Sequence, residues 1–221
     1  MWYVDKLMLI IKRSVLLLAL SSAALPARPD PVRDLVLAAQ LDSASSARKL
    51  LASGLSANTR DPLSGEPVML VALREGADGV IGVLVADKDF NPELAAPNGN
   101  TPLMMAAYKH NKRAVQALLA RGAAVDQPGW TALHYAAASG DTDIAAILLA
   151  HKAAIDAESP SKLTPLMMAA REGQDQCVAL LLRAGANARL RNNENLSASQ
   201  IALRAEKPAI AAAIDAFLAT R

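Results

Sequence analysis

Apolar side chains recur three and four positions apart through most of the chain after residue 30, with polar residues between them. In residues 101–110 and 112–121 this spacing predicts two short amphipathic helices separated by a turn near Asn111. Helices of this length are marginal alone in water, so they need neighbours that bury their apolar faces. Only 3% of the residues are aromatic, which leaves alanine and leucine to build the core. Such a core favours closely packed helices, and we expect an all-α fold.

The helical pattern is itself repeated along the chain. The heptapeptide TPLMMAA occurs at residues 101–107 and again at 164–170, and TALHYAA lies between them at 131–137. The second halves repeat as AVQALLARGAAVD, IAAILLAHKAAID and CVALLLRAGANAR. The threonines that open the first three segments are 30 and 33 residues apart, a period that indicates a solenoid. We expect a repeat domain over residues 30–221 with about six units, at 30–63, 64–98, 99–128, 129–161, 162–194 and 195–221.

Residues with special backbone preferences fall where these helices should begin and end. A threonine is a good N-cap, and a proline fits the first helical position because no N–H is needed there. The chain places Thr101, Thr131 and Thr164 at the starts of first helices, with Pro102 and Pro165 directly after two of them. Glycines suit the left-handed position that ends a helix, and the second helices should end at Gly54, Gly122 and Gly185.

These features resemble ankyrin repeats, whose period is 33 residues and whose hallmark is T-P-L-H-x-A. The period, the LLxxG endings and the Ala-Ala pairs match in at least four units. The resemblance implies a solenoid of stacked helix-turn-helix units with short projecting hairpins, and a non-catalytic scaffold that binds another protein. It also implies that His134, in the motif's histidine position, forms hydrogen bonds within and between units. Met104 and Met167 take this position in two other units, where a thioether accepts only weakly and donates nothing.

Residues 1–27 have the three parts of a secretory signal peptide. Lys12 and Arg13 precede an uncharged stretch of 12 residues, Ser14 to Leu25, and small residues follow. A bilayer-spanning helix needs about 20 residues, so this stretch is short for an anchor. We expect cleavage after Ala23 or Ala27, and a periplasmic or secreted protein with no membrane contact after cleavage. A membrane-anchored structural protein with an uncleaved leader is the alternative. The leader and the repeats together resemble exported bacterial ankyrin proteins, which pair such a leader with a short array.

Composition argues against several other classes of function. Without residues 1–27 the chain carries 20 basic and 20 acidic side chains, with no basic run that would bind the phosphates of a nucleic acid. No histidine pair has metal-ligand spacing, and the single cysteine, Cys177, excludes an intramolecular disulfide and a multi-cysteine zinc site. The sequence also lacks the Gly-x-Ser-x-Gly motif, the P-loop and the His-Glu-x-x-His motif. We therefore expect no cofactor and no metal, and an exported hydrolase or metal-dependent enzyme is the disfavoured alternative.

The candidate binding surface follows from the resemblance, because ankyrin arrays bind proteins through hairpin tips and the exposed side of the first helices. That surface comprises Arg74, Glu75, Tyr108, Lys109, Trp130, Tyr135, Ser139, Arg171 and Glu172. The link from Asp126 to Thr131 is shorter than its neighbours, so Trp130 either contacts the partner or packs over the next unit. We expect a monomer that acts as an inhibitor or immunity protein, or as a protective factor, for a secreted enzyme.

Overall fold

The computed structural model describes residues 30–220, and the predicted leader lies outside the described residues. Within this range the regular structure is entirely helical, as the apolar spacing predicts, and comprises twelve helices. They are α2 (Pro31–Gln40), α3 (Ala44–Ala52), α4 (Val68–Glu75), α5 (Asp78–Ala86), α6 (Pro102–Tyr108), α7 (Lys112–Ala120), α8 (Ala132–Ser139), α9 (Thr142–Ala150), α10 (Pro165–Glu172), α11 (Asp175–Arg183), α12 (Ala198–Arg204) and α13 (Pro208–Ala219).

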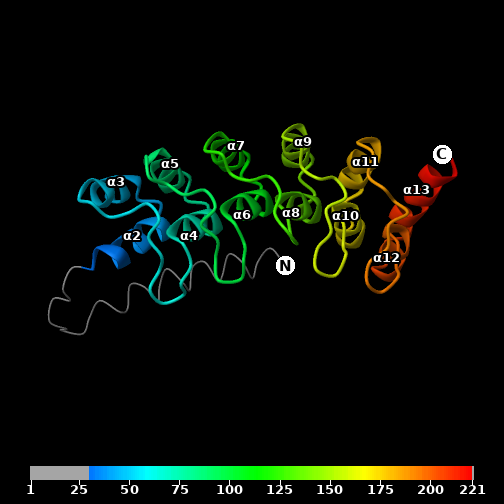
Figure 1. The fold of residues 1–221 in the computed structure, drawn as a ribbon, viewed down its shortest axis with the longest axis horizontal. Coiled ribbons are helices and arrows are strands. Elements are labelled where there is room, and N and C mark those ends of the chain that lie inside the picture. The colour runs from blue at the N-terminus through cyan, green and yellow to red at the C-terminus, as the bar shows by residue number, and fades with distance from the viewer. Residues whose placement is uncertain (1–29, 221) are drawn as a thin grey trace, which may run out of the picture. The chain divides into compact units, whose positions relative to one another are not determined.

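Residues 31–220 form one compact unit in which the helices pair along the chain. Each even-numbered helix packs against the odd-numbered helix that follows it, and one such pair falls in each of the six predicted repeats. The even-numbered first helices pack in order from α2 to α12, and the second helices form a parallel row from α3 to α13 (Figure 1). The solenoid predicted from the repeat period is confirmed, since each pair contacts only its neighbours.

Two of the three predicted threonine caps form cap hydrogen bonds, whereas the Thr131 hydroxyl is bonded to the His134 side chain and forms no such bond. The hydroxyl oxygens of Thr101 and Thr164 each accept a hydrogen bond, 3.3 Å long, from the backbone N–H three residues later. The Ser197 hydroxyl does the same in the last unit, where the Gln200 side chain accepts in return from the Ser197 N–H. These bonds satisfy backbone groups that a helix start leaves unpaired.

The second helices end as the glycine positions predict. Gly54, Gly122 and Gly185 all have positive φ, at 100°, 81° and 99°. In α7 the turn is closed by the N–H of Ala123, which donates to the Leu118 carbonyl. The unit built on α8 and α9 departs from this rule, because Lys152 holds the same position at φ 70°.

The hairpins between units are tied together by a recurring hydrogen bond. A side-chain oxygen of one hairpin accepts from a backbone N–H about one repeat later: Asn58 from Asn91, Glu93 from Ala124, Asp126 from Ala154, and Asp156 from Asn187. Figure 1 shows the loop between α7 and α8 stopping short of the other hairpins, as the five-residue link predicts. The hydrogen bonds between hairpins hold adjacent hairpins at a fixed spacing.

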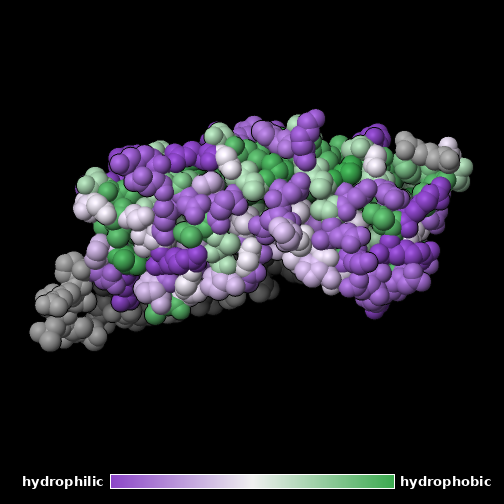
Figure 2. All heavy atoms as spheres, in the orientation of Figure 1, coloured by the Kyte–Doolittle hydropathy of each residue, from purple (hydrophilic) through white to green (hydrophobic). Residues whose placement is uncertain are grey.

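The core lies between the two rows of helices and is built almost wholly from small aliphatic residues. Leu103, Leu133 and Leu166 are fully buried at equivalent positions of three first helices, and alanine pairs follow each of them. On the face shown in Figure 2, green apolar atoms show between second helices along the top, whereas purple hydrophilic residues cover the hairpin before α12. None of the described helices has both the length and the apolar character needed to cross a bilayer.

Candidate functional site

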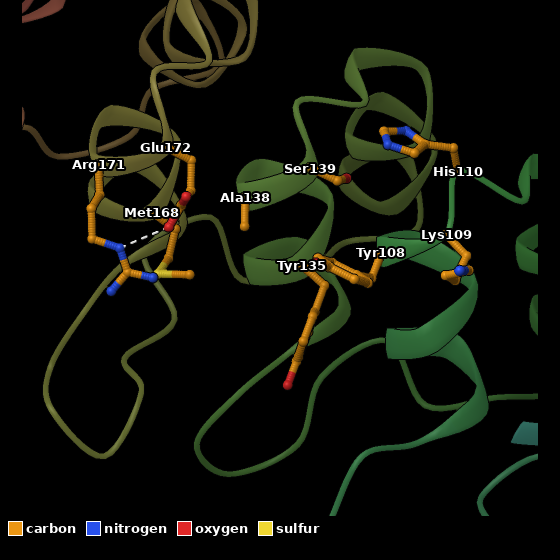
Figure 3. A pocket seen from close by; sticks show the side chains of 9 residues that line it. All are labelled: Tyr108, Lys109, His110, Tyr135, Ala138, Ser139, Met168, Arg171 and Glu172. Atoms are coloured by element: carbon orange, nitrogen blue, oxygen red, sulfur yellow. Dashed lines mark hydrogen bonds and ion pairs between the residues drawn. The ribbon is translucent and has the colours of Figure 1, made fainter. Parts of the chain in front are cut away.

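The last turns of the first helices differ from unit to unit, and the difference hollows the surface. At equivalent positions α6 ends in Tyr108-Lys109, α8 in Ala138-Ser139 and α10 in Arg171-Glu172. The two small side chains at the end of α8 therefore lie between two large side chains from α6 and two from α10. The result is an open groove of about 540 Å³, with α8 as its floor and α6 and α10 as its walls (Figure 3).

Six of the nine candidate residues from the sequence line this groove: Tyr108, Lys109, Tyr135, Ser139, Arg171 and Glu172. Trp130 does not line it but lies beside it, with its ring centroid 6.3 Å from that of Tyr135. Arg74 and Glu75 lie at the end of α4, outside the groove, where Arg74 forms ion pairs with Glu66 and Glu75. The structure thus gathers two thirds of the predicted surface at one place.

Two aromatic side chains, Tyr108 and Tyr135, line the groove and contact each other. Tyr108 meets Tyr135 edge to face, with ring centroids 6.1 Å apart and planes 84° apart. The Tyr135 hydroxyl donates to Asn100 Oδ1 at 2.8 Å, so the ring is held from the hairpin side. Burial raises the pKa of Tyr135, and the bond to Asn100 only partly opposes this, so Tyr135 stays a neutral donor at physiological pH.

Trp130 is half-buried and packs against its own unit. Its ring meets the His134 ring nearly edge-on, with centroids 5.3 Å apart. Aromatic contacts of this geometry add to the stability gained by area burial. Packing within the unit is therefore a role of Trp130 that the structure shows directly.

Some charged side chains around the groove have an ion-pair partner and others do not, among the described residues. Arg171 Nε donates to Glu172 Oε1 at 2.9 Å, and His110 Nδ1 lies 3.0 Å from Asp141 Oδ2. Lys109 has no ion pair or hydrogen bond from its side chain among the described residues. Within residues 30–220, its ammonium is thus a cation of the groove without a partner.

A second groove of about 590 Å³ lies next to the first along the array. It is bounded by α10, α12 and the hairpin between α11 and α12, and its polar lining includes Asn192, Asn193, Glu194 and Arg204. Arg171 lines both grooves. Arg171 is therefore a wall residue shared by two neighbouring grooves.

His134 is fully buried and fully bonded. Its Nε2 lies 2.9 Å from the Leu163 carbonyl, and its Nδ1 lies 3.1 Å from the Thr131 backbone nitrogen and 2.9 Å from the Thr131 hydroxyl. A carbonyl can only accept, so Nε2 carries the proton and Nδ1 accepts. Burial lowers the pKa of His134 and keeps the ring neutral. The bonds within and between units expected from the resemblance are confirmed.

Cys177 lies fully buried in α11. Burial, and secondarily the charge of Asp141, raise the pKa of the Cys177 thiol to about 11, so the thiolate needed for nucleophilic chemistry does not form near neutral pH. Among the described residues no three histidine, cysteine or acidic side chains are grouped as metal ligands would be.

Sequence reasoning missed three residues that line the groove: His110, Ala138 and Met168. Ala138 was missed because the candidates were chosen for large side chains, whereas Ala138 contributes to the groove through its small size. Aligning the helix ends YKH, ASG and REG at residues 108–110, 138–140 and 171–173 shows the gap directly. That comparison between repeats was the available signal.

Comparison with known proteins agrees with the repeat architecture described above. The family model described as ankyrin repeats (3 copies) matches residues 35–128, 68–159 and 124–192. Neurogenic locus notch homolog protein 1 is 35% identical over 136 residues in Xenopus tropicalis and 32% identical over the same length in Homo sapiens. Each match covers 60% of this chain and 5% of the relative. A probable E3 ubiquitin-protein ligase of Oryza sativa is 41% identical over 90 residues, which are 38% of this chain and 20% of that protein.

Proposed function

Because this chain belongs to the ankyrin-repeat family, we propose that it is a non-catalytic scaffold that binds a partner protein through the groove over α8. Ankyrin repeats are protein-binding modules that use extended concave surfaces, which indicates a protein-binding scaffold. The observation that supports this particular site is the replacement of large polar residues by Ala138 and Ser139 in a single unit. A solenoid with identical helix ends would have no such recess.

Rigidity favours binding at this site. The groove residues project from helices that are capped, stacked on both sides and tied through their hairpins. A preorganised surface loses little conformational entropy when it binds a partner. Tyrosine, tryptophan and arginine, the residue types that dominate binding hot spots, all occur in the groove or at its edge.

We further propose that the protein acts after export, as the leader predicted in residues 1–27 suggests, and that it binds as a monomer. Two roles fit this location: inhibition of a secreted enzyme, as an immunity protein does, or protection of such an enzyme. N-terminal sequencing of the protein recovered from a periplasmic extract tests export, with a new N-terminus expected at Ala24 or Arg28. An intact N-terminus in a membrane fraction would support the anchored alternative.

The binding groove is tested by filling it with residues that the fold already tolerates. The double variant Ala138→Arg, Ser139→Glu gives α8 the helix end that α10 has. Since the same pair is accommodated in α10, the variant should fold like the wild type and lose its partner in affinity capture from a periplasmic extract. The activity of the captured enzyme, measured with and without the scaffold, separates inhibition from protection.

A matched control adds the same residue types to the same unit outside the groove. Ala146 and Ala150 lie exposed on α9, in the row of second helices. The variant Ala146→Arg, Ala150→Glu should capture the partner at the wild-type yield. Equal yields from the groove-filling variant and the wild type would show that the partner binds elsewhere.

A further inference from the structure

The groove has more cationic than anionic groups on its walls, and one cation has no partner in the part of the chain that the structure describes. Arg171 and Glu172 neutralise each other on the α10 wall, and the side chain of His110 points to Asp141 of the next unit. Lys109, the C-cap residue directly after α6, is exposed and unpaired among the described residues. A bound partner can therefore supply a carboxylate to Lys109 without displacing an existing ion pair.

Two aromatic side chains, Tyr108 and Tyr135, line the same groove as Lys109. Tyr108 precedes Lys109 and is 52% exposed, so a partner can contact its ring. Figure 3 shows the Tyr108 and Tyr135 rings side by side at the centre of the groove, with Lys109 on the same wall as Tyr108. Aromatic rings in the same groove as a lysine that is unpaired among the described residues suit a short segment that carries an acidic and an apolar side chain.

We propose that the groove binds an extended acidic segment of the partner protein, with an aspartate or glutamate on Lys109 and a neighbouring apolar side chain against Tyr108 and Tyr135. This inference rests on the proposed function and specifies the chemistry of the partner. A nucleic acid fits less well, because Glu172 lies on the opposite wall and no row of cations follows the groove. Charge complementarity selects the acidic segment over a neutral or basic one.

The expected size of the effect follows from the exposure of the site. A single exposed ion pair contributes up to about 1 kcal/mol, which corresponds to roughly a fivefold change in Kd. Lys109→Met removes the charge and keeps most of the side-chain length, so it should raise Kd about fivefold. Lys109→Glu replaces attraction by repulsion and should raise Kd by about 20-fold or more. Both effects should shrink as salt is added.

The probe is a random peptide library displayed on phage and selected on the full chain as it is recovered from expressing cells. Peptides that bind the wild type but not the groove-filling variant Ala138→Arg, Ser139→Glu are synthesised, and their Kd is measured by fluorescence polarisation. We expect these peptides to be enriched in aspartate and glutamate next to apolar residues. Arg113→Glu is the matched control, because Arg113 is exposed on α7 in the same unit as Lys109 and should leave Kd within about twofold.

The outcomes separate this inference from the proposed function. Groove-dependent peptides without excess acidic residues, or a Kd that the Lys109 variants leave unchanged, would show that the groove is used by a partner of other chemistry. An equal loss of peptide affinity in the Arg113→Glu control would show a non-specific charge effect. Failure to recover any groove-dependent peptide would count against an extended segment as the ligand, while partner capture by the groove-filling variant would overturn the proposed function itself.

Discussion

His134 should make a measurable contribution to stability that two sister repeats lack. Met104 and Met167 hold the equivalent position in the units built on α6 and α10, so His134→Met converts one unit into the chemistry of its neighbours without changing the fold. A methionine thioether can replace the His134 ring as a hydrogen-bond acceptor, because Met104 Sδ accepts from the Thr101 N–H at 3.5 Å. It cannot replace the donor, so the Leu163 carbonyl loses its bond from Nε2.

The magnitude follows from this difference. Loss of one hydrogen bond to a largely buried acceptor costs about 1–2 kcal/mol, and the edge-on contact with Trp130 adds a fraction of that. We therefore expect His134→Met to lower the free energy of unfolding by about 1.5 kcal/mol. Urea denaturation followed by circular dichroism should show the midpoint falling by about 0.7 M, for a typical slope near 2 kcal/mol per M. A loss below about 0.3 kcal/mol would refute the assignment of the inter-unit bond.

The pH dependence gives an independent check. The folded-state pKa of His134 is lowered, chiefly by burial, and a protonated Nδ1 would also face the Thr131 N–H donor. The unfolded chain takes up the proton at about pH 6.5, so the stabilisation is present above that pH and is lost as pH falls toward the folded-state pKa. The wild type should lose stability between about pH 6.5 and 5.5 faster than His134→Met. Parallel curves for the two proteins would contradict a buried neutral imidazole.

Three further substitutions test the repeat architecture by the same urea measurement. Leu181→Ala should cost about 2–5 kcal/mol, because Leu181 is fully buried in α11, and a negligible loss would mean that α11 is not packed as described. Lys152→Gly should stabilise by about 1 kcal/mol, since φ is 70° where other units have glycine, whereas a loss would show that the lysine side chain has a role there. Gly140→Ala should cost at least about 1 kcal/mol, because φ is 78° and the new methyl group meets Gln174; a neutral result would show that this turn readily shifts.

The sequence predicts most of the fold because each structural rule is used several times. The spacing of apolar residues, the threonine caps and the glycine ends recur at one period, and agreement among copies separates the signal from chance. The exceptions arise where a unit departs from the shared pattern for reasons that a single sequence does not reveal. Lys152 stands where Gly122 and Gly185 stand in other units, so aligning the repeats locates the turn, but residue type alone does not predict a left-handed lysine.

The candidate site is predicted less completely, because its shape depends on what is missing from one unit. Exposure and residue type identify Tyr108, Lys109 and Arg171 as candidates, but neither reveals that they face one another across a recess. The recess comes from Ala138 and Ser139, which appear unremarkable in isolation. The position of Trp130 similarly depends on how its ring lies against His134, which requires coordinates.

The repeat architecture explains why one unit can carry such a recess without destabilising the others. Stability in a solenoid is a sum of terms within units and between neighbours, so a surface change in one unit costs little elsewhere. The unit built on α8 and α9 differs in two ways at once, with a shortened hairpin before it and small residues at the end of its first helix. Its buried positions nevertheless keep the shared pattern, with Leu133, His134 and the following alanines all inside. Since packing does not require those surface differences, positions where one repeat departs from its siblings on the exposed side are the best guide to function in this chain.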